Sequence, residues 1–188
     1  MNRGSPEPGH WPSPLSARQV AAPGSRPSEV QVADGALFWS EGRAAEGGRV
    51  AIVRWTPEDG AVDVVPADAD VRTRVNEYGG GAWRVAPGVL YASARSDGRV
   101  WAFPFGPRGA LSAPQPVTAA CPSDATIRYA DLQLTPDGGT LLCVRERPVP
   151  GAEALQELVA IRLSDGAVNI LAAGSSFVAD PRVSVDGS

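Results

Sequence analysis

The sequence has 188 residues, of which 43% are apolar and 20% charged, and its formal net charge is -4. This is the composition of a globular protein, and the acidic balance argues against a nucleic-acid partner. No apolar run reaches the ~20 residues that a membrane helix needs, so no membrane partner is predicted. The N-terminus has no apolar signal segment, and Cys121 and Cys143 form no Cys-x-x-Cys pair. These features predict reduced thiols and a cytoplasmic location.

Residues 1–28 are rich in Pro, Ser, Gly and Arg, so they can bury little surface. They predict a flexible N-terminal arm. Within it, Ser16 followed by Gln19 has the spacing of a capping box, and Pro23-Gly24 follows soon after. We therefore expect one or two helical turns in an arm that otherwise lacks regular structure.

From Glu29 onward the pattern is that of β-strands, with short apolar or alternating runs and no long helix. The runs fall into three sets of four. Innermost strands are expected at 29–33, 81–85 and 130–134, second strands from Leu37, Leu90 and Leu141, third strands at 50–54, 100–103 and 159–163, and outer strands at 61–65, 110–111 and 167–171. Tight turns are expected at Asp59-Gly60, Asp97-Gly98, Asp137-Gly138 and Asp165-Gly166, because Asp-Gly tolerates the positive φ of hairpin turns.

Two segments of the sequence repeat one another at a spacing of 49 residues. Residues 130–138 and 179–187 both open with Ala-Asp and close with Asp-Gly. A period near fifty with Asp-Gly turns is typical of β-propeller blades. The fold class predicted is therefore all-β: an incomplete propeller of about three blades, at 29–80, 81–127 and 128–176, plus a strand beginning at 177.

Three blades cannot close a ring of ordinary radius, and six at this period need about 300 residues. An open arc exposes one blade face and unpaired strand edges. We therefore expect marginal stability in isolation and self-association through the open edge.

Several stretches, in order along the chain, resemble the N-terminal propeller of serine peptidases of the prolyl oligopeptidase family. The nearest branch is that of bacterial dipeptidyl aminopeptidases and acylaminoacyl-peptidase-like enzymes. The stretches are 11–16, 38–49, 71–82, 128–132, 143–146, 157–161 and 181–187. The chain departs from the family pattern at Asn76, where His is usual before Glu-Tyr-Gly-Gly, and at Val185, where Pro is usual. The resemblance implies the first half of a propeller with six to eight blades, truncated before the α/β-hydrolase domain that it caps in such enzymes.

The residues of a serine hydrolase are missing from the chain. Such an enzyme needs a nucleophile, an imidazole base and an orienting carboxylate. The only histidine is His10, in the arm, and there is no Gly-x-Ser-x-Gly segment. One histidine and two separated cysteines also form no recognisable metal-ligand set. We therefore predict no catalytic residues, metal or cofactor, and no activity of this chain alone.

The best candidate for a functional surface is the segment from Asp70 to Gly81. If it is a strand, Val71, Thr73 and Val75 share one face, and the polar side chains share the other. The candidate residues for substrate gating or for an interface are Arg72, Arg74, Asn76, Glu77 and Tyr78. The three glycines that follow allow unusual backbone angles or close approach. The alternative is a bend between blades, in which Glu77 and Tyr78 bind neighbouring backbone.

Three further groups of residues have a structural and a functional interpretation. Glu41, Arg43, Glu46 and Arg49 could recognise a substrate or form a solvated charged loop. Asp131 and Asp180 recur at one repeat position, which favours a turn or a hydrogen bond between blades over catalysis. The residues Trp39, Trp55, Trp83 and Trp101 fit an inter-blade core better than a ligand cage.

Two functions follow from these patterns. The first is a non-catalytic propeller fragment of a serine peptidase, which meets peptide substrates only through the missing hydrolase domain. The second is a stand-alone propeller-like module for binding or interaction.

Overall fold

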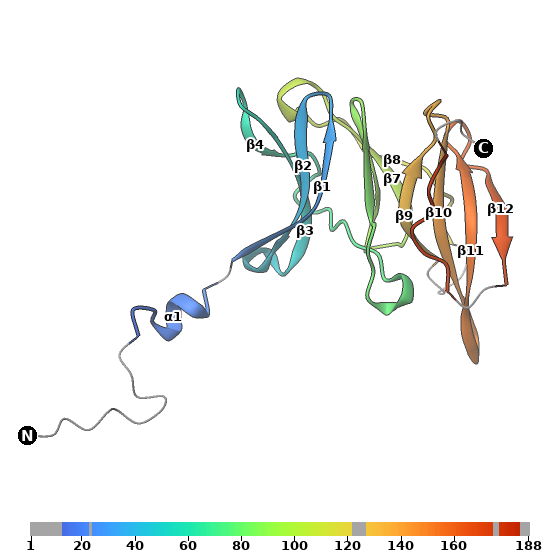
Figure 1. Ribbon diagram of the computed structural model, residues 1–188, viewed down its shortest axis with the longest axis horizontal. Helices are drawn as coiled ribbons and strands as arrows, with labels where there is room; N and C mark the ends of the chain where they lie inside the picture. Colours follow the sequence, from blue (N-terminus) through green and yellow to red (C-terminus); the bar gives the residue numbers. More distant parts are fainter. Residues whose placement is uncertain (1–12, 23, 122–126, 175–176, 185–188) are drawn as a thin grey trace, which may run out of the picture.

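The computed structural model describes residues 13–22, 24–121, 127–174 and 177–184. His10, Trp11 and the end of the second repeat, residues 185–187, lie outside them. Helix α1 (Ala17–Val20) precedes the sheets and stands apart from them (Figure 1). Its N-cap is Ser16, whose Oγ accepts from Gln19 N–H (3.2 Å) while Ser16 N–H donates to Gln19 Oε1 (2.8 Å). The capping box is therefore confirmed.

The described part of the chain forms three four-stranded antiparallel sheets, each a run of consecutive strands. In each sheet the spatial order of the strands follows their order in the chain. The strands are β1 (Ser25–Ala33), β2 (Ala36–Arg43), β3 (Arg49–Thr56) and β4 (Gly60–Asp63); β5 (Trp83–Ala86), β6 (Val89–Ser93), β7 (Val100–Pro104) and β8 (Gln115–Pro116); and β9 (Arg128–Leu134), β10 (Thr140–Val149), β11 (Ala152–Arg162) and β12 (Val168–Ala173). Three short 3-10 helices are η1 (Ala44–Glu46), η2 (Val75–Glu77) and η3 (Pro107–Gly109). The all-β class is confirmed.

The sheets stand beside one another in chain order, with β1, β5 and β9 as neighbouring first strands (Figure 1). One apolar core joins the first and second sheets, and another joins the second and third. The first core includes Phe38, Ile52, Val65, Trp83 and Leu90, and the second includes Val100, Tyr129, Leu141, Cys143 and Ile161. Burying one large apolar side chain contributes about 1.5–3 kcal/mol, so these two layers dominate stability. This stacking of four-stranded meanders is propeller-like.

The four Asp-Gly pairs that were expected to form hairpin turns all do so. They connect β3 with β4, β6 with β7, β9 with β10 and β11 with β12. Their glycines have φ of 70° or 71°. Glycine adopts this left-handed backbone at little cost, so the four predicted turns are confirmed.

Several strand boundaries differ from the prediction; β11, for example, begins at Ala152 rather than Val159. Strand β1 begins at Ser25 rather than Glu29, because residues 25–28 pair with Arg43 to Ser40 of β2. The outer strand of the second sheet is Gln115–Pro116 rather than 110–111, since Leu111 forms only a single bridge with Phe105. Residues 177–184 are not assigned to a strand. The opening of a fourth blade there remains a prediction.

The outer face of the first sheet carries an exposed apolar row. Val32 pairs with Leu37, and Leu37 pairs with Trp55, so the three side chains lie on one face. They are 70%, 40% and 38% exposed, respectively. Trp83, by contrast, is buried between sheets. The core assignment is therefore right for Trp83 and wrong for Trp55 in this chain.

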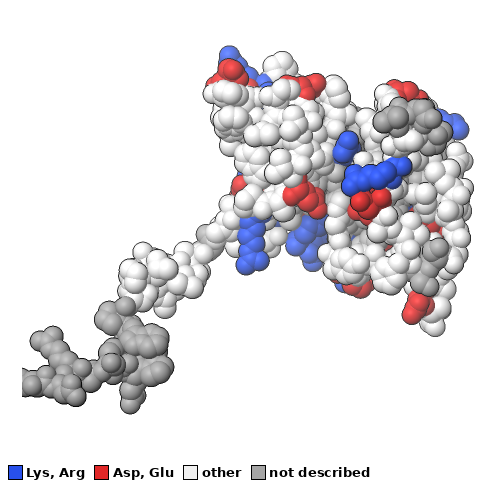
Figure 2. Space-filling model, viewed as in Figure 1, with Lys and Arg blue, Asp and Glu red and all other residues white. Residues whose placement is uncertain are grey.

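No helix among the described residues is long and apolar enough to span a membrane. The visible face of the molecule is mostly uncharged, and basic and acidic side chains lie next to one another near the boundary of the second and third sheets (Figure 2).

Candidate functional site

The segment from Val71 to Glu77 is not a continuous strand, so the predicted alternation of faces is wrong beyond its first residue. Val71 forms one bridge with Ala94, and the chain then turns into η2. Within η2, Asn76 and Glu77 have φ of 56° and 65°. The buried Val75 docks against Ala130 and Val144 of the third sheet. Because Val75 anchors this turn on the third sheet, the polar residues on either side of it lie at the junction of the second and third sheets.

Arg128, on β9, gathers the polar atoms of this junction. Its Nη1 donates to Glu77 Oε1 (2.6 Å), to Glu146 Oε1 (2.9 Å) and to the carbonyl oxygen of Arg74 (2.9 Å). Hydrogen bonds from Arg128 and then from Arg74 hold the pKa of Glu77 below its ordinary value. Burial works against the charged form of Arg128, yet its two carboxylate partners raise its pKa. Both groups are therefore charged at neutral pH.

Asn76 links three parts of the chain. Its backbone N–H donates to Glu146 Oε2 (2.8 Å), and its side-chain oxygen accepts from Gln156 Nε2. Gln156 Oε1 in turn accepts from the N–H of Val178 (2.8 Å). Glu146 and Gln156 are both buried. The residue type suits the position, because Asn tolerates left-handed backbone better than most residues.

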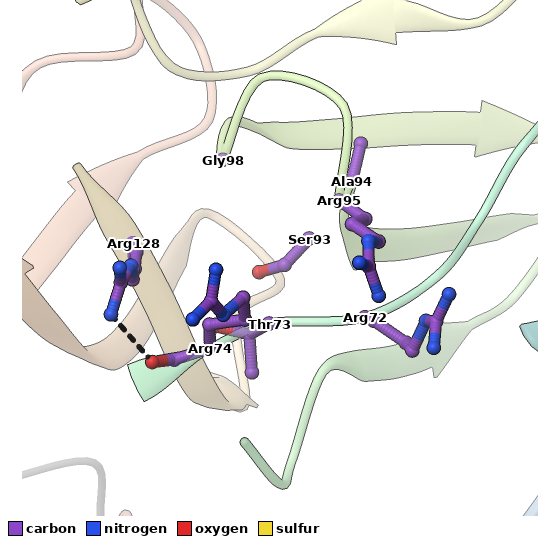
Figure 3. Close-up of a pocket in the computed structure, with 8 residues that line it drawn as sticks. All are labelled: Arg72, Thr73, Arg74, Ser93, Ala94, Arg95, Gly98 and Arg128. Carbon is purple, nitrogen blue, oxygen red and sulfur yellow. Dashed lines mark hydrogen bonds between the residues drawn. The ribbon is translucent and has the colours of Figure 1, made fainter. Parts of the chain in front are cut away.

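A small pocket lies beside this polar junction, with a volume of about 40 Å³. Its lining comes from the segment after Asp70, the β6–β7 hairpin and β9 (Figure 3). The lining residues are Arg72, Thr73, Arg74, Ser93, Ala94, Arg95, Gly98 and Arg128. The dashed hydrogen bond in Figure 3 joins Arg128 to the Arg74 carbonyl. The pocket is thus built from one sheet junction and is rich in guanidinium groups.

The structure brings together four of the five predicted site residues. Arg74, Asn76 and Glu77 belong to the polar junction, and Arg72 lines the adjoining pocket, where it also pairs with Asp70. Tyr78 is 79% exposed and does not line that pocket. The alternative of a bend is right about the backbone, but Glu77 binds arginine side chains rather than neighbouring backbone.

The sequence interpretation missed the partners that complete the junction, Arg128, Glu146 and Gln156, and it missed Arg95, which lines the pocket. The available signal was a carboxylate in phase with the buried apolar positions of a strand, as at Glu146, two residues after Val144 in β10. A buried carboxylate needs a paired cation, so such a residue indicates a polar network. The identity of the partner could not follow, because Arg128 is 18 residues away and Asn76 is 70.

Of the three glycines after Tyr78, Gly79 and Gly81 are explained by close packing, whereas a Cβ on Gly80 would meet nothing within 4 Å. A Cβ on Gly79 would lie 2.5 Å from the Thr73 carbonyl oxygen. A Cβ on Gly81 would lie 2.6 Å from Asp131 Cα and 2.7 Å from Asp131 N. The glycine run therefore lets the chain pass against β9.

The other candidate groups have structural roles. Arg43 forms a two-pronged pair with Asp63 (2.7 and 2.6 Å) and also binds Glu41, while Arg49 binds Glu46. These charges are engaged with one another rather than simply solvated. The recurring aspartates are linked, since Asp180 N–H donates to Asp131 Oδ2 (2.8 Å). This confirms the predicted hydrogen bond between repeats.

The described residues offer neither a reactive thiol at Cys143 nor a cluster of metal ligands. Cys143 is buried in the second core, and burial raises the pKa of its thiol, which makes it unreactive. In the described ranges no three or more His, Cys, Asp and Glu side chains are grouped to hold a metal ion.

No protein-family model matches the sequence, and a search of curated proteins found no significant match. Solved structures do match. A puromycin-hydrolyzing peptidase of Mycobacterium tuberculosis superimposes with a TM-score of 0.80 at 34% identity, over 94% of this chain and 29% of that one. A puromycin hydrolase gives 0.80 at 30% identity with the same coverage. A mutant of puromycin hydrolase complexed with PGG gives 0.78 at 32% identity, again over 94% and 29%.

The chain therefore has the fold of a segment found in puromycin-hydrolyzing peptidases. It spans 29% of the length of each of these structures.

Proposed function

We propose that this chain is a non-catalytic N-terminal propeller part of a serine peptidase of the prolyl oligopeptidase family. In that role it caps and gates an α/β-hydrolase domain that cleaves short peptides. The observation that carries the proposal is the superposition with peptidases over 94% of this chain and only 29% of theirs. The residues themselves agree, because the sequence holds one histidine and no nucleophile elbow.

In this proposal the three sheets are three blades, at 29–80, 81–127 and 128–176, and a fourth begins at 177. The complete ring has six to eight blades. The support is the repeated geometry: each first strand packs beside the next, and a hydrogen bond joins Asp131 and Asp180 at the repeat spacing of 49 residues. The branch within the family, dipeptidyl aminopeptidase or acylaminoacyl-peptidase-like, and the cytoplasmic location belong to the same proposal.

The gating role is assigned to Arg72, Arg74, Asn76, Glu77 and Tyr78. The support is that four of them lie at a polar junction between neighbouring sheets, next to a pocket. Tyr78 is exposed and so is available to a docked domain or substrate. Charged side chains held by pairing present a fixed pattern to a passing peptide, which costs little reorganisation.

Sequencing the coding DNA beyond residue 188 tests the assignment directly. We expect further repeats near fifty residues with Asp-Gly turns, followed by a segment that encodes Gly-x-Ser-x-Gly. A stop codon directly after Ser188 in the genome would contradict the proposal.

The purified 188-residue chain is expected to show no hydrolysis of puromycin or of dipeptidyl and acylaminoacyl chromogenic substrates above the buffer rate. The physical reason is that acyl transfer needs an imidazole base beside its nucleophile. The assay is release of chromophore at high protein concentration, with trypsin-like contaminants excluded by inhibitor controls. Turnover that co-purifies with the chain and survives His10→Ala would contradict this expectation.

A second candidate function is a stand-alone binding module that associates with itself. The observation that favours it is the exposed row of Val32, Leu37 and Trp55 on the first sheet. An exposed apolar patch of this kind is typical of interaction surfaces. In analytical ultracentrifugation we expect a concentration-dependent dimer whose dissociation constant rises about tenfold or more in the double variant Leu37→Ser, Trp55→Ser. A monomer at all concentrations, or an unchanged dimer in the variant, would contradict it.

A further inference from the structure

We propose that the pocket beside the polar junction is a carboxylate-binding site, with Arg95 as its principal ligand. The inference does not rest on the proposed peptidase role, because it follows from the charges around the pocket. The carboxylate that binds there comes from one of two sources, a free small carboxylic acid or the C-terminus of a short peptide.

The first step is the state of the four arginines that line the pocket. Arg72 is paired with Asp70, Arg74 with Glu77, and Arg128 with both Glu77 and Glu146. The guanidinium of Arg95 has no hydrogen-bond or ion-pair partner among the described residues. Arg95 is held through its backbone, since its N–H donates to the Asp70 carbonyl (3.0 Å). Arg95 therefore contributes to the pocket lining a guanidinium that is paired with no described residue.

The second step is the charge balance. The carboxylates near the pocket are Asp70, Glu77 and Glu146, and each already accepts from an arginine. Asp97, in the adjoining hairpin, accepts from the Trp101 indole and from Arg99 N–H. Of the four guanidinium groups that line the pocket, those of Arg72, Arg74 and Arg128 are paired with carboxylates, and that of Arg95 is not paired with any carboxylate of the described residues. A carboxylate ligand would supply the missing anion beside Arg95.

The third step is the size and chemistry of the space. Its volume of about 40 Å³ suits a group of a few atoms such as a carboxylate. In Figure 3 the side chain of Ser93 is seen between the guanidinium groups of Arg74 and Arg95. Arginine presents its donors in a planar fork that matches the two oxygens of a carboxylate. The hydroxyl of Ser93 is committed to the Tyr129 carbonyl (2.8 Å), so it orients the wall rather than reacting.

The test is a titration of the folded 188-residue chain at constant ionic strength, followed by NMR chemical shifts and by calorimetry. The ligands are sodium acetate, glycylglycine and glycylglycine amide. We expect acetate and glycylglycine to bind and the amide to fail. Binding of acetate alone identifies a free acid as the source, whereas tighter binding of glycylglycine identifies a peptide terminus.

Arg95→Gln is expected to weaken acetate binding by about tenfold, the effect of one charge-assisted hydrogen bond. Arg95 is exposed, so the variant should fold normally.

Arg84→Gln is the matched control, because the guanidinium of Arg84 on β5 also lacks a partner among the described residues and lies outside the pocket. Arg84→Gln should change binding less than twofold. Equal weakening in both variants, or no acetate binding by the folded wild type, would overturn the site. Arg95→Lys provides a second variant that keeps the charge without the fork, and full retention of affinity there would overturn the two-oxygen geometry.

Discussion

Replacing Gly81 by alanine is expected to lower the free energy of unfolding by about 3 kcal/mol or more, from left-handed strain and overpacking together. Gly81 has φ of 54°, and an added Cβ would meet a side-chain oxygen of Asp131 as well as its Cα and N, at 2.6 and 2.7 Å. The side chain of Asp131 could move aside, but its backbone is part of β9. Relief therefore requires the second and third sheets to separate.

Gly81 is also a hydrogen-bonding centre for all three sheets. Its N–H donates to Glu29 Oε1 (3.2 Å) in β1, and its carbonyl accepts from Leu132 N–H (3.3 Å) in β9. Movement at this residue weakens both links at once. The effect of the substitution should therefore exceed that of an ordinary glycine in a turn.

Gly138→Ala is the matched control for this experiment. Gly138 has φ of 70°, close to that of Gly81, but nothing lies within 4 Å of its added Cβ. Only backbone strain remains, about 1 kcal/mol. Urea unfolding followed by circular dichroism measures both variants. Equal losses would show that the contact with Asp131 is not what requires glycine at position 81.

The position of Gly81 reveals a repeat that residue types conceal. Four residues occupy nearly equivalent positions in successive repeats, and all have φ between 50° and 56°. They are Glu29, Gly81, Asp131 and Asp180. The sequence comparison detected only Asp131 and Asp180, because these share a side chain. The common property is a left-handed backbone, and carboxylates of Glu29 and Asp131 accept from the next member of the series. Comparing residue types does not reveal such a repeat of backbone conformation, because glycine, aspartate and glutamate all adopt it here.

Strands and turns could be predicted here because their signals are local. Each Asp-Gly pair specifies its own hairpin, and a run such as Leu141 to Val144 shows its burial in its apolar content. The outer strand Gln115–Pro116 was missed because it has two residues and no apolar pattern.

The polar junction could be predicted only in part, for the opposite reason. The segment around Asn76 stands out as polar before glycines, but its partners lie far along the chain. Gln156 is 80 residues away from Asn76, and Arg128 is 51 from Glu77. The stacking of sheets decides such pairings, and a single sequence carries no direct record of them.

Replacing Glu157 by glutamine is expected to destabilise the chain by about 2 to 3 kcal/mol, since the partly buried Arg145 and its neighbour Arg147 both lose a charged acceptor. The Glu157 side chain is only 4% exposed and lies between two arginines of β10. Its oxygens accept from Arg145 at 2.6 Å and from Arg147 at 2.8 Å. Glutamine keeps the shape of the side chain but removes the charge. Arg162→Gln, on the same strand β11, removes the exposed pair with Asp165 and should cost less than about 1 kcal/mol.

The pH dependence gives an independent test of the same pair. The hydrogen bond from Arg147, against the opposing effect of burial, lowers the pKa of Glu157 below its ordinary value of 4.5. A carboxyl whose pKa is lower in the folded state stabilises the fold fully above its unfolded pKa, and this contribution is lost as pH falls through the folded value. The difference in unfolding free energy between wild type and Glu157→Gln should thus be constant near pH 7 and shrink below about pH 4.5. Urea unfolding at a series of pH values measures it. A difference that grows with acid, or one no larger than that of Arg162→Gln at pH 7, would show that the buried ion pair does not stabilise the third sheet.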